Sequence, residues 1–176
     1  YEESPLNNFE KNKFKDLFIN RYPEFDLMFE EAAQETGIEK NLLAAISFQE
    51  SQWDPRAQSN MGVRGMMMVT LETAALVGVE KRLNPEQNIK GGAKYFAMLK
   101  EKNIVGQTDA DQLSTVLASY NLGPTNIIKI ANQINSDIQT VTWLEIREKL
   151  KVIKGSELDL VDRESYSRGQ QAIDYV

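Results

Sequence analysis

Apolar residues recur every three or four positions along most of the chain, which is the spacing of one face of an α-helix. The pattern predicts a first helix that Pro23 ends, because proline cannot continue a helix interior. A second helix follows and stops at Gly37, a residue suited to a left-handed C-terminal cap. A third is predicted over about residues 39–51. The apolar positions of the first two helices are Phe9, Phe14, Leu17, Phe18, Phe25, Met28, Phe29, Ala32 and Ala33.

Further helices begin at recognisable N-terminal caps. Asn84 precedes Pro85, and Gln87 stands three residues after the cap. Residues 109–112 are expected to open another helix in the same way, which the Gly-Pro pair at 123–124 closes. Residues 142–145 form a capping box. Strand-like alternation is confined to residues 104–106, so the pattern predicts an all-α fold of roughly seven to nine helices.

The length of 176 residues corresponds to one domain, or two at most. No internal repeat, low-complexity tract or linker interrupts the chain. We expect residues 1–22 to form a polar lead-in and a first helix, and residues 23–176 to form the main domain. The chain begins without a start methionine or a leader pattern, so we expect it to be a mature or excised piece of a protein.

Composition excludes several kinds of chemistry. The chain has no histidine and no cysteine, which removes His-dependent nucleophiles, thiolates, disulfides and metal sites built from these residues. The net charge of −6 is the opposite of what a phosphate-backbone binder needs, so nucleic acid is not an expected partner. No stretch is apolar enough to span a membrane. Catalysis would therefore rest on carboxylates, hydroxyls, amides, lysine or arginine.

Glu50 stands out among the acidic residues. It follows Leu42 and Ile46 at intervals of four, so its carboxylate continues an apolar helical stripe. Burial and the negative end of the helix dipole both favour the protonated carboxyl, which is the state that a general acid needs. The alternatives are that Glu50 is the last exposed residue of the helix, or that it pairs with Arg56 or Arg64.

Three sequence blocks together resemble the lytic transglycosylases. Residues 50–68 read ESQWDPRAQSNMGVRGMMM, against a family pattern of Glu-Ser, then Pro-x-Ala-x-Ser, then Gly-x-x-Gly-Leu-Met-Gln. The blocks NIKGGAKY at 88–95 and ASYNLGP at 118–124 follow in the family's order. Residues 42–49 and 166–176 resemble the membrane-bound lytic transglycosylase F branch. Met66 and Met68 stand where the common pattern has leucine and glutamine, and the F branch resembles this chain at Met68.

The resemblance implies an α-helical domain similar to goose-type lysozyme that cleaves the β-1,4 bond between N-acetylmuramic acid and N-acetylglucosamine in peptidoglycan. No water is consumed, and neither a cofactor nor a metal is implied. Glu50 would protonate the glycosidic oxygen and then, as a carboxylate, accept the proton of the muramoyl C6 hydroxyl, which closes a 1,6-anhydro ring. Asp54, the only nearby acid, precedes Pro55 and is better explained as a turn residue than as a nucleophile.

By the same resemblance, further residues are candidates for contacts with substrate. The Tyr120 hydroxyl would hold or orient Glu50, beside an Asn121 that looks more structural. Ser51 and Ser59 match family serines near the substrate, although a helix-terminal polar residue and a turn cap are the respective alternatives. Met66, Met67 and Met68 are expected to line the floor of a groove, or else to pack in the core.

Sugar rings stack on aromatic faces, and an aromatic side chain is equally at home in a protein core. The candidates for stacking on sugar are Trp53, Tyr95, Tyr166 and Tyr175.

The resemblance also suggests a setting for the protein. The partner would be the glycan strands of peptidoglycan, and a solute-binding-like regulatory domain and a lipid anchor to the outer membrane precede such domains in the F branch, which implies the periplasm. Three alternatives stay open: a hydrolytic lysozyme on the same fold, a silent peptidoglycan-binding module, and a helical interaction domain with an accidental match. A hydrolase would require a positioned water and usually a second carboxylate.

Overall fold

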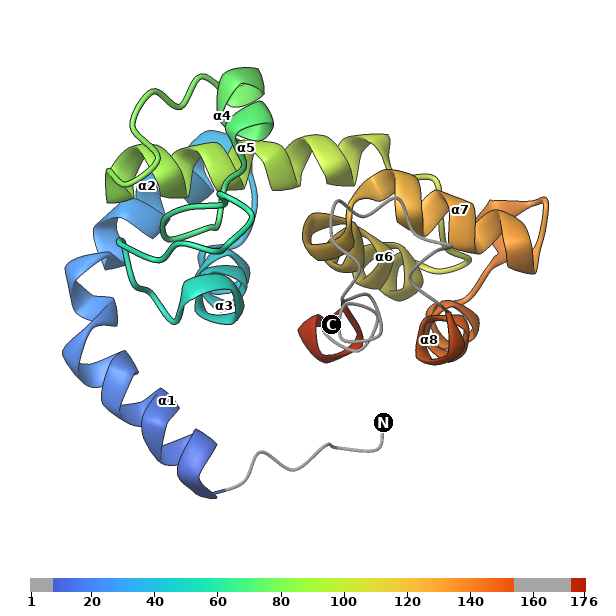
Figure 1. The fold of residues 1–176 in the computed structure, drawn as a ribbon, viewed down its shortest axis with the longest axis horizontal. Coiled ribbons are helices and arrows are strands. Elements are labelled where there is room, and N and C mark those ends of the chain that lie inside the picture. The colour runs from blue at the N-terminus through green and yellow to red at the C-terminus, as the bar shows by residue number, and fades with distance from the viewer. Residues whose placement is uncertain (1–7, 154–171) are drawn as a thin grey trace. The chain divides into compact units, whose positions relative to one another are not determined.

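The structure, a computed structural model, describes residues 8–153 and 172–176, and within these ranges the fold is all-α, as the sequence predicts. No strand forms in this part of the chain; the only bridges join Gln58 to Arg64 and Arg64 to Val69. Eight α-helices and two short 3-10 helices follow one another between residues 8 and 152, and residues 172–175 are also helical (Figure 1). They are α1 (Asn8–Asn20), η1 (Tyr22–Glu24), α2 (Asp26–Thr36), α3 (Lys40–Ser51), α4 (Leu71–Val77), α5 (Pro85–Lys102), α6 (Asp109–Leu122), α7 (Pro124–Ile134), η2 (Ile138–Thr140) and α8 (Trp143–Val152).

The chain forms two compact units, Tyr1–Ala97 and Met98–Val176, and α5 runs from the first into the second. The first unit has its own apolar core, supplied by α2, α3, α5 and the segment between α3 and α4. Its largest fully buried side chains are Trp53, Phe25, Phe29, Phe96, Leu43, Ile46, Met66, Met67 and Ile89.

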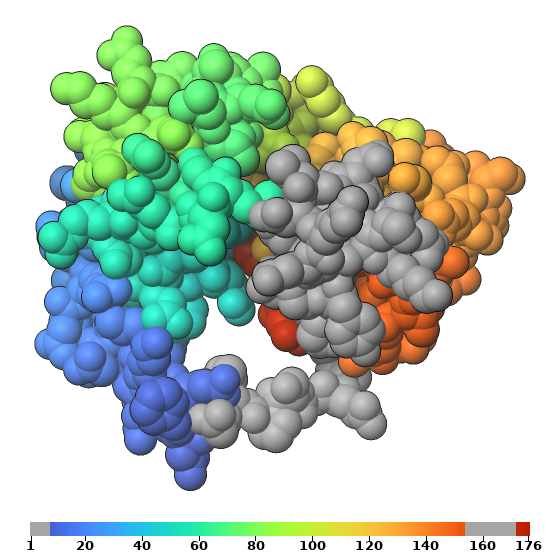
Figure 2. Space-filling model, in the orientation of Figure 1, coloured from blue at the N-terminus to red at the C-terminus, as the bar shows by residue number. Residues whose placement is uncertain are grey.

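The first helix ends earlier than predicted. The α-helix α1 stops at Asn20, and Pro23 lies inside the 3-10 helix η1 that follows. Proline fits there because the first residues of a helical turn need no N–H donor. None of the residues of α1 is buried, and the helix lies at the surface in Figure 2, where it is blue. Its contact with the unit is made by Phe14 and Phe18, whose rings lie 5.9 and 6.2 Å from that of Trp53.

The next two helices have the predicted boundaries. Gly37 caps α2 with φ at 71°, a left-handed conformation, and its N–H donates to the Ala33 carbonyl. Asp26, the first residue of α2, accepts hydrogen bonds from the Tyr22 hydroxyl and from Lys40, the first residue of α3. These two donors hold the pKa of Asp26 below its usual range. The contacts tie the N-termini of α2 and α3 together.

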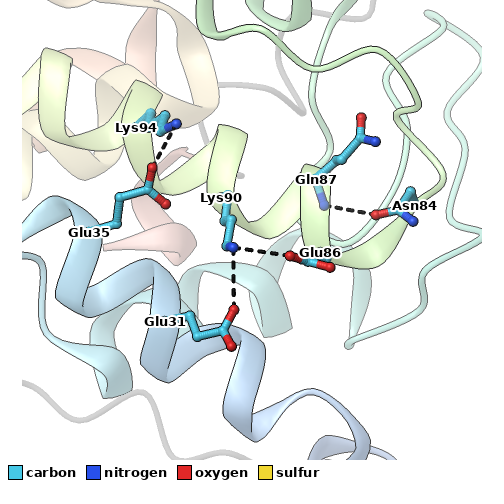
Figure 3. Close-up of polar contacts among 7 residues, drawn as sticks. All are labelled: Glu31, Glu35, Asn84, Glu86, Gln87, Lys90 and Lys94. Carbon is cyan, nitrogen blue, oxygen red and sulfur yellow. Dashed lines mark hydrogen bonds and ion pairs between the residues drawn. The ribbon is translucent and has the colours of Figure 1, made fainter.

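Ion pairs connect α2 to α5 on the surface of the first unit (Figure 3). Lys90 lies 3.3 Å from Glu31 and 3.0 Å from Glu86, and Lys94 lies 2.9 Å from Glu35. The hydrogen bond from Lys94 holds the pKa of Glu35 below its usual value. Exposed ion pairs of this kind contribute little to stability, so the buried contacts between these helices matter more for the fold.

Helix α5 begins as predicted, since Asn84 Oδ1 accepts from the Gln87 backbone N–H at 2.9 Å (Figure 3). Within the helix, Gly91 packs against the segment that follows α4. A Cβ atom at Gly91 would overlap the Val79 side chain and lie 3.2 Å from Val77 Cγ2. The absence of a side chain at Gly91 therefore permits this close contact.

We expect Gly91→Ala to lower the free energy of unfolding by about 1–3 kcal/mol, because the clash with Val79 outweighs the higher helix propensity of alanine. Denaturant unfolding followed by circular dichroism would measure the change. Adding Val79→Ala should recover part of the loss, since it removes the overlapping methyl groups. A Gly91→Ala protein as stable as the unmodified chain would contradict this account of the packing.

In the second unit, α6, α7 and α8 pack on one another around a single cluster of buried residues. Helix α6 is capped by Thr108, one residue before the predicted cap. Asp111 completes a capping box, because its side chain accepts a hydrogen bond from the Thr108 backbone N–H. The box at Thr142 and Glu145 forms as predicted. The core consists of Val105, Ala118, Leu122, Ile127, Ile130, Ala131, Val141, Ile146, Leu150, Ile153 and Ala172.

The Gly-Pro pair at the end of α6 has a second role. Gly123 ends α6 as predicted, but Pro124 is also the first residue of α7. The fixed φ of proline suits a first helical position, so the same dipeptide stops one helix and starts the next.

In the described residues, none of the helices combines the length and apolarity that crossing a bilayer requires.

Candidate active site

Glu50 lies in the last turn of α3, where the apolar stripe of that helix meets the surface. Leu43 and Ile46, earlier on the helix, are buried, whereas Glu50 is half-buried. Glu50 is thus partly covered by the protein and partly accessible to solvent. A general acid needs such access, because a substrate must reach it.

The chain leaves α3 through two residues with left-handed backbone conformations, Gln52 with φ at 53° and Trp53 with φ at 58°. Such conformations cost roughly 1–2 kcal/mol in residues other than glycine and persist only where other contacts hold them. Here Trp53 is only 2% exposed and donates its indole N–H to the Ala44 carbonyl at 2.9 Å. Arg21 also donates to the Gln52 carbonyl at 3.0 Å. The helix end that carries Glu50 is therefore anchored on both sides.

The burial of Trp53 assigns it to the core. Four aromatic rings surround its indole, at centroid distances between 4.9 and 6.2 Å. Of the four aromatic candidates for stacking on sugar, Trp53 and Tyr175 are buried, Tyr95 is half-buried, and Tyr166 lies outside the described residues. The rings around Trp53 are those of Phe14, Phe18, Tyr22 and Phe48.

A tight turn between residues 62 and 69, which we call the Met66 turn, packs against the same end of α3. The Met66 carbonyl accepts hydrogen bonds from the hydroxyls of Ser47 and Ser51, both at 2.8 Å. Ser51 Oγ also lies 3.1 Å from the Ser47 carbonyl. The Ser51 hydroxyl thus has a structural partner next to Glu50, as the helix-terminal alternative for this residue predicts; its contact with substrate stays a prediction.

Ser59 and Asp54 organise the segment between α3 and the Met66 turn. Ser59 Oγ accepts from the backbone N–H groups of Met61 at 3.2 Å and Val63 at 3.3 Å, which is the behaviour of a turn cap. Asp54 Oδ1 accepts from the Arg56 N–H at 2.9 Å. Asp54 therefore forms the turn that its position before proline predicts.

Two of the three methionines in the Met66 turn do not line a groove. Met66 and Met67 are both fully buried, so the expectation that they form a groove floor is corrected in favour of its alternative, core packing. Met68 is half-buried and has a left-handed backbone conformation, with φ at 49°. Met68 is thus the member of the group whose side chain reaches the surface.

Asn88 supports the Met66 turn, a role that its sequence pattern did not predict. This residue of α5 is fully buried, and its Oδ1 accepts from the Met67 N–H at 2.7 Å. Its Nδ2 donates to the carbonyls of Arg64 at 2.9 Å and Arg82 at 2.8 Å. The signal in the sequence was an amide beside Ile89 in the block at 88–95, because a polar side chain that is buried next to an apolar one requires partners.

Tyr95, on α5 of the first unit, is half-buried, and burial raises the pKa of its hydroxyl. Tyr120 and Asn121 belong to the second unit. The Tyr120 ring stacks on that of Tyr175, with centroids 6.5 Å apart and planes 23° apart. Asn121 Oδ1 is buried and accepts no hydrogen bond from the described residues. The orienting role of Tyr120 and the substrate contacts of Tyr95 and Asn121 stay predictions.

The described residues contain no cluster of three or more acidic side chains placed to hold a metal ion. In the first unit, Glu50 is a half-buried residue in the last turn of α3, next to the backbone contacts described above. Residues 27–141 match the family model of the transglycosylase SLT domain, and the chain belongs to this family.

Curated relatives point to one branch of the family. The chain is 40% identical over 160 residues to membrane-bound lytic murein transglycosylase F 1 of Alkalilimnicola ehrlichii, and 36% identical over 162 residues to membrane-bound lytic murein transglycosylase F of Hahella chejuensis. Each alignment covers 89% of this chain but only 32% and 31% of the relatives. The chain therefore spans about a third of the length of the curated relatives it matches.

Solved structures support the fold. The chain matches an inactive mutant of lytic transglycosylase Slt from Pseudomonas aeruginosa with a TM-score of 0.57 at 20% identity, covering 85% of this chain and 22% of that one. It matches the 70 kDa soluble lytic transglycosylase of Escherichia coli with a TM-score of 0.57 at 18% identity, covering 86% and 24%. The expected fold class is confirmed.

Proposed function

We propose that this chain is a peptidoglycan lytic transglycosylase that cleaves the β-1,4 bond between N-acetylmuramic acid and N-acetylglucosamine without water. The observation that carries the proposal is the position of Glu50, a half-buried carboxyl at the end of α3, in a chain of the SLT family. Relatives at up to 40% identity are named lytic murein transglycosylases, which supports murein as the substrate.

The proposed reaction uses Glu50 twice. Its protonated carboxyl donates a proton to the glycosidic oxygen, and the bond between that oxygen and C1 of the muramoyl residue breaks. The N-acetyl group of the same sugar stabilises the positive charge that develops at C1. The Glu50 carboxylate then accepts the proton of the C6 hydroxyl as its oxygen bonds to C1, which closes the 1,6-anhydro ring and restores the acid.

This sequence of steps needs one carboxylate, so it requires no catalytic role for Asp54. Hydrolases of glycosides generally use a pair of carboxylates about 5–10 Å apart, one of them a nucleophile or a base for water. Asp54 is the acid nearest to Glu50 in sequence, and its Oδ1 forms a turn with Arg56. A role in the turn explains Asp54 without assigning it to catalysis.

The products separate this proposal from its alternatives. Purified peptidoglycan is incubated with the protein, and the released muropeptides are analysed by mass spectrometry before and after borohydride reduction. We expect products lighter than those of a lysozyme by one water and resistant to reduction, because the anhydro ring has no free reducing end. Reducible products of full mass would indicate a hydrolytic muramidase, and the absence of products would indicate a binding module.

The setting of the protein is proposed from its relatives. Their names describe membrane-bound enzymes, and this chain corresponds to about a third of their length. We infer that the whole protein acts in the periplasm, associated with the outer membrane, and that a regulatory domain accompanies the unit carrying Glu50. Fractionation of cells that produce the full-length protein would test the location, since recovery in the inner membrane or the cytosol would contradict it.

A further inference from the structure

The amide of Asn88 makes an unusually complete set of contacts for one side chain. It is fully buried, and its acceptor and both of its donors bind backbone groups outside its own helix. Two of these groups, the Met67 N–H and the Arg64 carbonyl, belong to the Met66 turn, and the third is the Arg82 carbonyl. A buried amide with this many partners fixes the position of the backbone that it contacts.

The Met66 turn is shaped to admit this amide. Gly65 has φ at 84°, and a Cβ atom built there would lie 2.7 Å from Asn88 Cγ and would overlap the Arg82 carbonyl. The residue opposite Asn88 must therefore lack a side chain. Arg82 closes the turn from the same side, because its Nη1 donates to the carbonyls of Gly62 at 2.5 Å and Val69 at 3.1 Å.

The turn is also bonded to the helix that carries Glu50. Met66 lies between Arg64 and Met67, the two residues of the turn that Asn88 contacts. The Met66 carbonyl accepts hydrogen bonds from the hydroxyls of Ser47 and Ser51 in the last turns of α3. Ser47, like Asn88, is fully buried. A continuous path of hydrogen bonds thus runs from α5 through the backbone of the turn to the residues on either side of Glu50.

We propose that Asn88 is a positioning residue for Glu50: by fixing the Met66 turn, it sets where the last turn of α3 lies and hence where the catalytic carboxyl is held. The inference rests on the proposed function of Glu50. Acid and base catalysis depend on the position of the catalytic group relative to the substrate. A displacement of about 1 Å can lower the rate by about a hundredfold. Asn88 itself touches neither substrate nor the reacting atoms in this role.

The test compares Asn88→Ala with Ile89→Ala, its neighbour on α5, which is equally buried but bonds to no part of the Met66 turn through its side chain. Both purified proteins are assayed on uncrosslinked peptidoglycan glycan strands, at a temperature where circular dichroism shows each to be folded. We expect Asn88→Ala to lower kcat by about tenfold or more while KM changes by less than about threefold. Ile89→Ala should keep kcat within about threefold of the unmodified protein.

Ser47→Ala provides a second test that does not depend on the folding of Asn88→Ala. The Met66 carbonyl keeps its bond from Ser51 in this variant, so the fold should persist. We expect kcat to fall severalfold, again with little change in KM, because one of the two links between turn and helix is lost.

Normal kcat in a folded Asn88→Ala protein, or equal losses in Asn88→Ala and Ile89→Ala, would overturn the positioning role. If Asn88→Ala does not fold, normal kcat in Ser47→Ala would overturn it instead. A failure of the proposed function looks different, because the unmodified protein would then release no anhydro products.

Discussion

Glu50→Gln is expected to lower the rate of glycan cleavage by about 10³-fold or more while leaving the fold unchanged. The amide has the shape of the carboxyl but can neither donate a proton to the glycosidic oxygen nor accept one from the C6 hydroxyl. Because the proposed mechanism uses the same group in both steps, no other residue would replace it. Release of anhydromuropeptides, measured by mass spectrometry over time, gives the rate, and circular dichroism checks the fold.

Asp54→Asn is the matched control. An asparagine Oδ1 can accept the hydrogen bond that Asp54 accepts from the Arg56 N–H, so the turn should persist. If Asp54 acts only in that turn, the variant should retain cleavage within about threefold of the unmodified chain. A loss as large as that of Glu50→Gln would show that two carboxylates take part and would favour a lysozyme-type mechanism. Substantial turnover by Glu50→Gln would contradict the single-residue mechanism outright.

Trp53→Ala is expected to lower the free energy of unfolding of the first unit by about 3–5 kcal/mol. The indole is 2% exposed and fills the centre of a cluster of four aromatic rings, so its removal leaves a large cavity. The Ala44 carbonyl also loses its donor. Urea unfolding followed by far-ultraviolet circular dichroism would measure the change. Cleavage should fall as well, because Trp53 holds the strained exit from the helix that carries Glu50.

Trp53→Phe separates packing from hydrogen bonding. The smaller ring keeps part of the aromatic contact but cannot donate to the Ala44 carbonyl, so we expect a loss of about 1–3 kcal/mol. A Trp53→Ala protein that unfolds at the same urea concentration as the unmodified chain would show that the cluster of α1, η1 and α3 contributes little to the fold. In that case Arg21, which donates to the Gln52 carbonyl, would be left as the anchor of the helix end.

The candidate site has one proposed catalytic group, the Glu50 carboxyl, and many residues that hold the backbone near it. The backbone beyond Glu50 adopts left-handed conformations at two consecutive residues, Gln52 and Trp53, and again at Met68. Buried Ser47 of α3 and Asn88 of α5 bond to the backbone of the Met66 turn and hold it in place. We infer that the stability of the first unit and the placement of its catalytic group depend on many of the same contacts.

Much of the secondary structure could be predicted from the sequence because it is decided locally. Gly37 ends α2, Asn84 opens α5 and Thr142 opens α8, and each cap bonds to backbone groups three or four residues away. The apolar stripe of α3 likewise placed Glu50 at a helix end. Where local prediction failed, the error was small: a cap at Thr108 instead of Asp109, and Pro23 inside a 3-10 turn.

The sequence by itself determined the helical class, most helix ends, the candidate acid and the family, because these depend on residue types at short, fixed spacings. Only the tertiary structure decided that Met67 is buried, that Trp53 is a core residue and that Asn88 supports the Met66 turn. Those roles arise from contacts between groups distant in the chain: Ser47 bonds to a residue 19 positions away, and Asn88 to one 24 positions away. The physical reason is that such partners meet only when the helices pack, and no local pattern records which backbone groups will then face a buried hydroxyl or amide.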